Sequence, residues 1–374
     1  MIRFENVIKK YNEKDRPAVD NLDLHIKEGE ICMLVGPSGC GKTTTMKMIN
    51  KLIKSTSGKI YVNGEDIESL DPIKLRLKIG YVIQGTGLFP HMTIGENVAM
   101  VPNELGWDKN KISKKVDELL ELMDLDPEVY RDKRPRDLSG GQRQRVGVAR
   151  ALAADPPVML MDEPFGALDP ITRGKIQDEF LRVQEKIGKT IVFVTHDIDE
   201  AIKMGDKIAV MRDGKLVQFG TPAEILSNPA DDFVSDLIGG NSAIKMMNLM
   251  KCKDVYRELP YIDYKEKSSE ALKLMLKHEV KNILVTQSGQ KLLGYVRYKD
   301  VFKNKEKEVS ELINDIEETV TPKTTLQDAL SKMFSIGRKA IFVSKEKGRV
   351  EGIITMDDLL KAVSDDDQDE NTSA

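Results

Sequence analysis

The sequence predicts an α/β protein whose first domain contains a parallel sheet and whose second, smaller domain is also α/β. Three observations support this prediction. Short apolar runs alternate with helical stretches in the N-terminal part of the 374-residue chain, which is the pattern of strand–helix–strand units. The first fully apolar run ends in a glycine-rich loop that fits a phosphate-binding pattern. In the C-terminal part, the chain repeats itself at a constant offset.

The predicted elements follow one another along the first domain. Residues 2–30 alternate between apolar and polar side chains, which predicts strands with one exposed face. Residues 31–35 (ICMLV) are all apolar and predict a buried parallel strand, and residues 43–53 predict the helix after it. The stretch from about 90 to 150 is more helical and predicts an inserted subdomain. Further strands are expected at 158–161, 190–195 and 207–211, with helices at 172–187 and 198–204.

Composition limits the class of protein. The 57 Lys and Arg residues nearly balance the 61 Asp and Glu residues, and the formal net charge is -4. We therefore expect no nucleic-acid partner, because nucleic-acid binding favours a strongly basic surface. The cysteines Cys32, Cys40 and Cys252 lack the spacing of a disulfide framework or a zinc site. No secretory signal and no apolar run of membrane-spanning length is expected, so another polypeptide must form any transport path.

The phosphate-binding pattern lies at residues 36–43, GPSGCGKT, between a predicted strand and a predicted helix. In such a loop the backbone amides point inward as an anion nest, and the next helix directs its positive N-terminus at the phosphates. Lys42 is expected to reach the β- and γ-phosphates of ATP, and the Thr43 hydroxyl is expected to bind Mg²⁺. The expected nucleotide-binding residues of this loop are Gly36, Pro37, Ser38, Gly39, Cys40, Gly41, Lys42, Thr43 and Thr44.

A second buried strand ends in two carboxylates. Residues 158–164, VMLMDEP, are apolar up to Asp162 and Glu163. Downstream of a phosphate loop, Asp162 is placed to hold Mg²⁺ through water, and Glu163 is placed to polarise the attacking water as a general base. The sequence therefore predicts a hydrolase that transfers a phosphoryl group from a nucleotide to water.

A second glycine-rich loop, LSGGQRQR at 138–145, opens a predicted amphipathic helix. Ser139 and the amides of Gly140 and Gly141 form another anion-binding helix N-terminus. Here the sequence resembles the ABC-transporter ATPase family, in which LSGGQ is the signature. The resemblance implies that Ser139, Gly140, Gly141 and Gln142 close over the γ-phosphate bound by the opposite subunit, so that ATP lies between the two subunits of a homodimer.

Four further positions match this family, and the resemblance covers about residues 1–235. Tyr11 resembles the aromatic residue that stacks on adenine, and Asp169, in GALD, resembles the aspartate at the dimer interface. Gln84, in YVIQ, resembles the glutamine that senses Mg²⁺ and the membrane subunit. His196, in FVTHD, resembles the switch histidine that contacts the γ-phosphate. The resemblance implies Lys42, Gln84, Glu163 and His196 as catalytic residues and Thr43, Gln84 and Asp162 as Mg²⁺ ligands.

The C-terminal part contains a tandem repeat. Residues 268–302 align without gaps on a later stretch, so that Ala271 corresponds to Ala329 and Asp300 to Asp358, an offset of 58 residues. Each copy predicts helix, strand, strand and helix, and two such units are expected to bury their faces mutually. The pair resembles tandem cystathionine-β-synthase-like (CBS) domains.

Within the CBS family, a Thr or Ser and an Asp three residues later bind ribose or phosphate. Thr355 and Asp358, in GIITMDD, match this motif, whereas the first copy keeps Asp300 but has Arg297 at the hydroxyl position. The resemblance implies a regulatory ligand that gates the ATPase, such as an adenine nucleotide or cyclic di-AMP. A response to ionic strength and a purely structural dimerisation module are alternatives.

The expected boundaries follow from these motifs. The last residues, DDDQDENTSA, are acidic and lack apolar anchors, which is typical of disorder. The sequence predicts an ATPase domain at 1–238 with its helical subdomain at about 90–150, a linker at 239–250, a CBS pair at 251–364 with repeats at about 251–307 and 308–364, and an acidic disordered tail at 365–374.

An ABC ATPase with a C-terminal CBS pair resembles the ATPases of bacterial importers for quaternary-amine osmoprotectants (glycine betaine, carnitine or choline). Residues 81–98 are similar to that branch, although Gly85 stands where a Gln is expected. The resemblance implies a position at the cytoplasmic face of the cell membrane, beneath transmembrane permease subunits, with an extracellular substrate-binding protein acting through the permease. One alternative is an importer ATPase for another small polar substrate, such as an amino acid. Another is a non-transport ABC ATPase, which the single cassette without a coiled coil disfavours.

Overall fold

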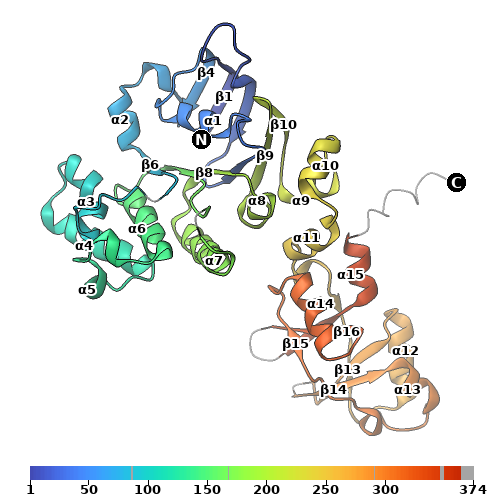
Figure 1. Ribbon diagram of the computed structural model, residues 1–374. Helices are drawn as coiled ribbons and strands as arrows, with labels where there is room; N and C mark the ends of the chain where they lie inside the picture. The colour runs from blue at the N-terminus through green and yellow to red at the C-terminus, as the bar shows by residue number, and fades with distance from the viewer. Residues whose placement is uncertain (86, 167, 290, 346–348, 364–374) are drawn as a thin grey trace. The chain divides into compact units, whose positions relative to one another are not determined.

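The computed structural model describes residues 1–85, 87–166, 168–289, 291–345 and 349–363 (Figure 1). Its internal contacts divide the chain into two units, Met1–Gly240 and a second unit that begins at Asn241. The acidic tail predicted at 365–374 lies outside the described residues.

A six-stranded sheet forms the centre of the first unit. Its strand order is β10-β9-β3-β8-β7-β6, and neighbouring strands are parallel except for β10 and β9. Strands β3 (Ile31–Val35), β7 (Val158–Asp162) and β8 (Thr190–Thr195) are buried at every residue, as expected where both faces of a sheet are covered. The parallel sheet predicted from the apolar runs is confirmed. The other strands are β6 (Ile79–Val82), β9 (Lys207–Arg212) and β10 (Lys215–Gly220).

The alternating N-terminal residues form a separate four-stranded antiparallel sheet with the order β2-β1-β4-β5. Its buried residues, among them Phe4 and Ile26, share one core with Met46 and with Leu34 and Val194 of the six-stranded sheet. This shared core places the phosphate loop at the junction of the two sheets. The bounds are β1 (Ile2–Lys9), β2 (Val19–Ile26), β4 (Ser57–Val62), β5 (Glu65–Asp66) and α1 (Lys42–Ile49).

Helix α1 is shorter than the sequence predicts. It ends at Ile49 rather than near residue 53, with Asn50 as its C-cap. Lys51 has φ of 53°, a left-handed backbone conformation that a right-handed helix does not contain. The Lys51 ammonium donates to the carbonyl oxygens of Glu68 and Leu70, which fixes this bend in the chain.

The helical subdomain consists of four helices, as predicted for about residues 90–150. Helix α3 packs on α4 and α6, and α6 contacts strand β6. The Thr93 hydroxyl and Glu96 form a reciprocal capping box that starts α3. The helices of this subdomain are α3 (Ile94–Glu104), α4 (Lys109–Leu122), α5 (Pro127–Tyr130) and α6 (Gly140–Leu152).

The other helices of the first unit are α2 and α7 to α10. The ring of Phe165 lies 6.1 Å from that of Phe180 and 5.6 Å from that of Phe193, which packs α7 on this sheet. Helix α8 contacts β3 and β8. The bounds are α2 (Pro72–Leu77), α7 (Pro170–Ile187), α8 (Ile198–Met204), α9 (Pro222–Ser227) and α10 (Asp232–Ile238).

The second unit repeats one supersecondary motif at the predicted offset. One sheet has the order β12-β13-β14 and the other β11-β17-β16-β15. The first repeat contains α12 (Ser268–Lys277), β13 (Asn282–Gln287), β14 (Lys291–Arg297) and α13 (Tyr298–Lys303). The second contains α14 (Leu326–Ser335), β16 (Ala340–Lys345), β17 (Arg349–Thr355) and α15 (Met356–Val363). The short strands are β11 (Arg257–Glu258), β12 (Tyr261–Asp263) and β15 (Thr319–Val320).

The predicted linker at 239–250 is corrected by the structure. Most of it forms helix α11 (Ser242–Leu249), which packs against α14 and α15. Met247 of this helix is buried in the core of the second repeat. Because α11 buries apolar surface in that core, these residues belong to the second unit rather than to a free linker.

Candidate nucleotide site

The phosphate loop runs from the end of β3 to the start of α1, as its sequence context predicts. Gly41 immediately precedes α1 with φ of 106°, a conformation that favours glycine. A side chain at this position would also overlap the backbone carbonyl of Ala18. The loop backbone therefore lies against the neighbouring chain, and its path depends on glycine at position 41.

Lys42 is almost fully buried at 6% exposure. Its ammonium donates to the carbonyl oxygens of Gly36 at 2.6 Å and Pro37 at 2.9 Å. These hydrogen bonds hold the Lys42 ammonium against the loop that is predicted to bind the phosphates. Burial raises the pKa of the neighbouring Cys40 thiol, so this side chain stays neutral and contributes to the loop through its backbone.

Thr43 and Asp162 come together from two different elements. The Thr43 hydroxyl donates to Asp162 Oδ1 at 3.1 Å, and the Lys47 ammonium lies 4.0 Å from Asp162 Oδ2. Burial raises the pKa of the Asp162 carboxyl, and the hydrogen bond from Thr43 partly opposes that shift. A hydroxyl beside a desolvated carboxylate is a donor set that suits a hard cation.

This donor set fits Mg²⁺ held partly by a nucleotide. No group of three or more His, Cys, Asp and Glu side chains with metal-site spacing occurs in the described residues. Mg²⁺ commonly uses one or two carboxylates together with substrate phosphates and water rather than an all-protein cage. The pairing of Thr43 with Asp162 is therefore compatible with this mode of binding.

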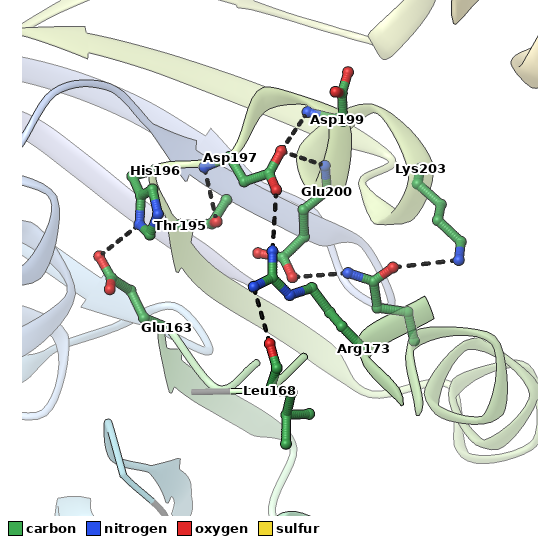
Figure 2. A network of polar contacts seen from close by, with 10 residues as sticks. Glu163, Leu168, Arg173, Thr195, His196, Asp197, Asp199, Glu200 and Lys203 are labelled. Atoms are coloured by element: carbon green, nitrogen blue, oxygen red, sulfur yellow. Dashed lines mark hydrogen bonds and ion pairs between the residues drawn. The ribbon is translucent and has the colours of Figure 1, made fainter. Parts of the chain in front are cut away.

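Glu163 is the point where three loops meet. Its carboxylate accepts a hydrogen bond from Gln84 Nε2 at 3.2 Å. The same carboxylate lies 3.4 Å from His196 Nδ1 (Figure 2). These residues follow β6, β7 and β8, whose parallel carboxyl ends share one edge of the sheet. The backbone of Glu163 has φ of 45° and its amide donates to Val194. Such a left-handed residue is strained by about 1–3 kcal/mol, and strain of this kind clusters at functional sites.

Tyr11 lies beside the start of α1. Its ring is 59% exposed, and its hydroxyl lies 3.2 Å from the Thr44 hydroxyl. The Lys9 ammonium lies 5.1 Å from the ring centroid. An exposed aromatic face next to the phosphate loop is available for stacking on a base.

The signature residues form a separate helix N-terminus. The Ser139 hydroxyl accepts from the Gln142 amide at 3.2 Å, and Gln142 Oε1 accepts from the Ser139 amide at 2.9 Å. Gly140 and Gly141 lie between them in the first turn of α6. In the part of the chain that the structure describes, these hydrogen bonds stay within α6 and do not reach the phosphate loop of the same chain.

Asp169 caps the first turn of α7. Its carboxylate accepts from the Thr172 amide at 3.0 Å, and hydrogen bonds from Thr172 hold the Asp169 pKa below its ordinary value. Asp169 is exposed, so it is accessible to a second subunit.

Sequence reasoning missed the polar residues that connect α7 with the loop of His196. Arg173 on α7 faces Asp197, and Gln177 donates to Glu200 of α8 (Figure 2). These residues lie outside the quoted motifs, and their significance depends on the packing of α7 against α8. The only signal in the sequence is their position shortly after Asp169 and His196.

The second unit contains a cavity of about 340 Å³ lined by residues of both repeats. Arg297 and Thr355 line it, as do Arg338 and Glu317, which form an ion pair at 2.7 Å. Arg297 Nε also donates to the Asp300 carboxylate at 2.6 Å. The Arg at the first repeat's hydroxyl position is therefore held in place by the Asp that the two repeats share.

Asp358 does not line this cavity. It is 4% exposed, and its Oδ2 accepts from the Thr355 amide at 2.9 Å and the Thr355 hydroxyl at 2.6 Å. Its Oδ1 pairs with Arg257, a residue that sequence reasoning missed. Asp358 thus holds Thr355 in position through hydrogen bonds, and Thr355 itself lines the cavity.

The chain matches two family models. The ABC transporter model matches residues 19–166, and the CBS domain model matches residues 252–307 and 309–365. In the described part of the chain, no helix combines the length and apolar character needed to cross a membrane.

Three relatives are similar over nearly the whole chain. The choline transport ATP-binding protein OpuBA of Bacillus subtilis is 47% identical, with 98% of this chain and 97% of the relative covered. The glycine betaine/carnitine/choline transport ATP-binding protein OpuCA of Bacillus subtilis is 45% identical, with 98% and 97% covered. The osmoprotectant import ATP-binding protein OsmV of Salmonella typhimurium is 44% identical, with 97% and 96% covered.

Two solved structures each match about three-fifths of the chain. The dimeric structure of a post-hydrolysis state of the ATP-binding cassette MJ0796, bound to ADP and Pi, is 37% identical with a TM-score of 0.53. The match covers 59% of this chain and 99% of that one. The structure of cbiO1 from Clostridium perfringens, part of the ABC transporter complex cbiONQ, is 30% identical with a TM-score of 0.57 and covers 61% and 91%.

Proposed function

This chain belongs to the family of ABC-transporter ATP-binding subunits with tandem CBS domains, and from that premise we propose that it powers import of a quaternary amine. Glycine betaine, carnitine and choline are the proposed solutes. The observation that carries this proposal is an identity of 44–47% across both units to relatives named for choline, glycine betaine and carnitine transport and for osmoprotectant import. The chain supplies ATP hydrolysis, and membrane subunits form the path.

The proposed catalytic roles follow from the contacts around Glu163. Its carboxylate orients the attacking water and accepts a proton from it, while Gln84 and His196 hold that carboxylate from two sides. Lys42 stabilises the charge of the β- and γ-phosphates. Thr43 and Asp162 would hold Mg²⁺, with Gln84 as a further proposed ligand, and a bound Mg²⁺ would neutralise charge on the phosphate oxygens.

The proposed active form is a homodimer with two composite sites. Each chain contributes its phosphate loop and Glu163 to one site and Ser139, Gly140, Gly141 and Gln142 to the other. Two observations support this arrangement: the hydrogen bonds that Ser139 and Gln142 make in the described chain join them to each other and to Tyr130 rather than to the phosphate loop of the same chain, and a relative of known structure is dimeric with ADP and Pi. The exposed Asp169 is then available at the contact between subunits.

The proposed partners are transmembrane permease subunits and an extracellular substrate-binding protein that acts through them. The proposed location is the cytoplasmic face of the cell membrane, where ATP is available. The test is co-expression of this chain with the permease and substrate-binding subunits of its transport system, followed by uptake of labelled glycine betaine, carnitine, choline and an amino acid. ATP-dependent uptake of a quaternary amine is expected. Uptake of the amino acid alone would favour the other importer class.

We further propose that the cavity of the second unit binds a regulatory adenine nucleotide or cyclic di-AMP. Arg297 and Thr355 supply a guanidinium and a hydroxyl at its wall, and Asp300 and Asp358 hold these two side chains in position. An arginine side chain and a hydroxyl at one wall suit a phosphate or ribose. Glu317 and Arg338, which pair with each other, also line the cavity, together with the polar residues Asn282, Asp315, Glu318, Lys339 and Asp357.

Thermal melting of the full chain tests this regulatory site. AMP and cyclic di-AMP are expected to raise Tm in the wild type and in Lys42→Ala, but not in Arg297→Ala. The Lys42→Ala variant separates this site from the phosphate loop. If neither ligand raises Tm, the module acts by dimerisation or by a response to ionic strength.

A further inference from the structure

One arginine contacts both the loop of Asp169 and the loop of His196. Arg173 lies in the first turn of α7, four residues after Asp169. Its Nη2 donates to the backbone carbonyl of Leu168 at 3.1 Å, and its Nη1 lies 3.5 Å from Asp197 Oδ2 (Figure 2). A guanidinium is planar and holds its donors in a fixed geometry, so it sets the spacing between the two groups it contacts.

Asp197 in turn fixes the loop that presents His196. Its Oδ1 accepts from the amides of Asp199 at 2.9 Å and Glu200 at 3.3 Å, which caps α8. Its own amide donates to the Thr195 hydroxyl at 3.1 Å. His196 is therefore held between two anchored neighbours. Its position relative to Glu163, 3.4 Å away, follows the position of Asp197.

A hydrogen-bond network with one buried pair, Gln177 and Glu200, joins α7 to α8 beside this contact. Glu200 is 7% exposed and accepts from Gln177 Nε2 at 2.9 Å. Gln177 Oε1 accepts from the Lys203 ammonium at 3.2 Å (Figure 2). Lys203 also pairs with Asp178 at 2.7 Å. Burial raises the pKa of the Glu200 carboxyl, and hydrogen bonds from Thr195 and Gln177 partly oppose that shift. Gln177 and Glu200 are buried and paired, so their hydrogen bond joins α7 to α8, whereas Lys203 and Asp178 are exposed.

We propose that Arg173 is a positioning residue that couples the Asp169 loop to His196 and, through His196, to the catalytic carboxylate of Glu163. The inference rests on the proposed function, because it takes Asp169 to lie at the contact between subunits. A partner that docks against this loop moves the Leu168 carbonyl, and Arg173 transmits that displacement to Asp197. His196 then reaches its working position only when the dimer has closed, so that hydrolysis is confined to the closed state.

The experiment measures ATP hydrolysis by the full-length chain as a function of ATP concentration, together with Tm. Arg173→Gln removes the guanidinium, and Arg173→Lys keeps the charge without the planar group. Asp197→Asn removes the negative charge but keeps an oxygen that caps α8, because Asn is as good an N-cap as Asp. Arg182→Gln, an exposed residue on the same helix, is the matched control.

The expected result is a loss in kcat of about 10- to 100-fold for Arg173→Gln, the size that misplacement of a catalytic group by about 1 Å produces. KM for ATP and Tm should stay close to the wild-type values, and Arg173→Lys should recover part of kcat. The double variant of Arg173→Gln and Asp197→Asn should lose no more than the worse single variant, because both changes break one contact. Arg182→Gln should behave as the wild type.

Three outcomes would overturn the inference: wild-type kcat in Arg173→Gln, additive losses in the double variant, or a fall in Tm that accounts for the lost activity. The wild-type chain in the same assay separates this inference from the proposed function. Absence of hydrolysis by the wild type would contradict the ATPase function itself, whereas wild-type hydrolysis with unaffected Arg173 variants would contradict the positioning role alone.

Discussion

The side-chain amide of Gln84 donates to Glu163 Oε2 at 3.2 Å across 79 residues of sequence. This contact ties the loop after β6 directly to the residue proposed as general base. The other oxygen of the same carboxylate lies 3.4 Å from His196 Nδ1. Glu163 is therefore held from two sides, and each side belongs to a loop that follows a different strand from the one before Glu163.

Replacing the proposed base should separate binding from hydrolysis. Glu163→Gln keeps the shape of the side chain but cannot take a proton, so hydrolysis should fall by about 10²–10⁴-fold, the usual contribution of a general base. ATP should still bind and hold the dimer together. Phosphate release and size-exclusion chromatography with ATP measure these two effects. The control is Glu185→Gln, an exposed residue on α7. Normal turnover in Glu163→Gln would remove Glu163 from this role.

Removing the buried ammonium of the phosphate loop should affect binding first. Lys42→Ala deletes charge-assisted hydrogen bonds that are worth about 1.5–3 kcal/mol each. ATP affinity should therefore fall by roughly tenfold to a hundredfold, with loss of productive closure. Equilibrium binding of a fluorescent ATP analogue measures the change, and Lys54→Ala, an exposed lysine, provides the control. Unchanged ATP affinity would contradict the role of Lys42.

Mixing two inactive variants should restore hydrolysis if the sites are shared between subunits. Lys42→Ala damages the phosphate loop, and Ser139→Ala removes the signature hydroxyl together with its helix cap, worth about 1 kcal/mol. A mixed dimer of these variants has one intact site, built from the loop of one chain and the signature of the other. Phosphate release should exceed that of either variant alone. No recovery in verified mixed dimers would show that each chain completes its own site.

Two glycines of the phosphate loop should differ in their sensitivity to a methyl group. Both have positive φ, 81° at Gly39 and 106° at Gly41, so alanine is strained at each by about 1–3 kcal/mol. A side chain at Gly41 also overlaps the Ala18 carbonyl, whereas the space beside Gly39 is open. Chemical denaturation should show that Gly41→Ala has the lower free energy of unfolding of the two variants, by about 1 kcal/mol. Equal stabilities would contradict the close packing of the loop.

The two aspartates of the CBS repeats should differ in their effect on stability. Asp358→Ala removes a buried carboxylate that accepts two hydrogen bonds from Thr355 and pairs with Arg257. Its loss should destabilise the second unit by about 2–3 kcal/mol, as for charge-assisted hydrogen bonds. Asp300→Ala breaks a more exposed pair with Arg297 and should cost about 1 kcal/mol or less. Urea denaturation of the full chain measures both, and the reverse order would contradict this assignment.

The fold could be predicted from the sequence to the extent that its signals are local. Strands β3, β7 and β8 are fully buried, so they are continuous apolar runs, and their predicted and observed positions agree closely. The phosphate loop and the signature loop are contiguous, and each combines glycine with a helix start. The C-terminal repeat can be recognised in the sequence because both copies form the same elements and place the same residue types in them, 58 positions apart.

Contacts between distant segments were decided by the tertiary structure alone. Nothing in the sequence around Asp358 indicates that its partner is Arg257, and nothing near Asp197 indicates Arg173. Helix α11 lies in a stretch that the sequence predicts as a linker. Met247 of this helix is buried only because later residues form the core around it, and a local pattern does not reveal such a contact. Local patterns determine which elements form and where phosphate chemistry takes place. Packing determines which charged side chains meet, because a pairing across many residues depends on how the helices and sheets dock.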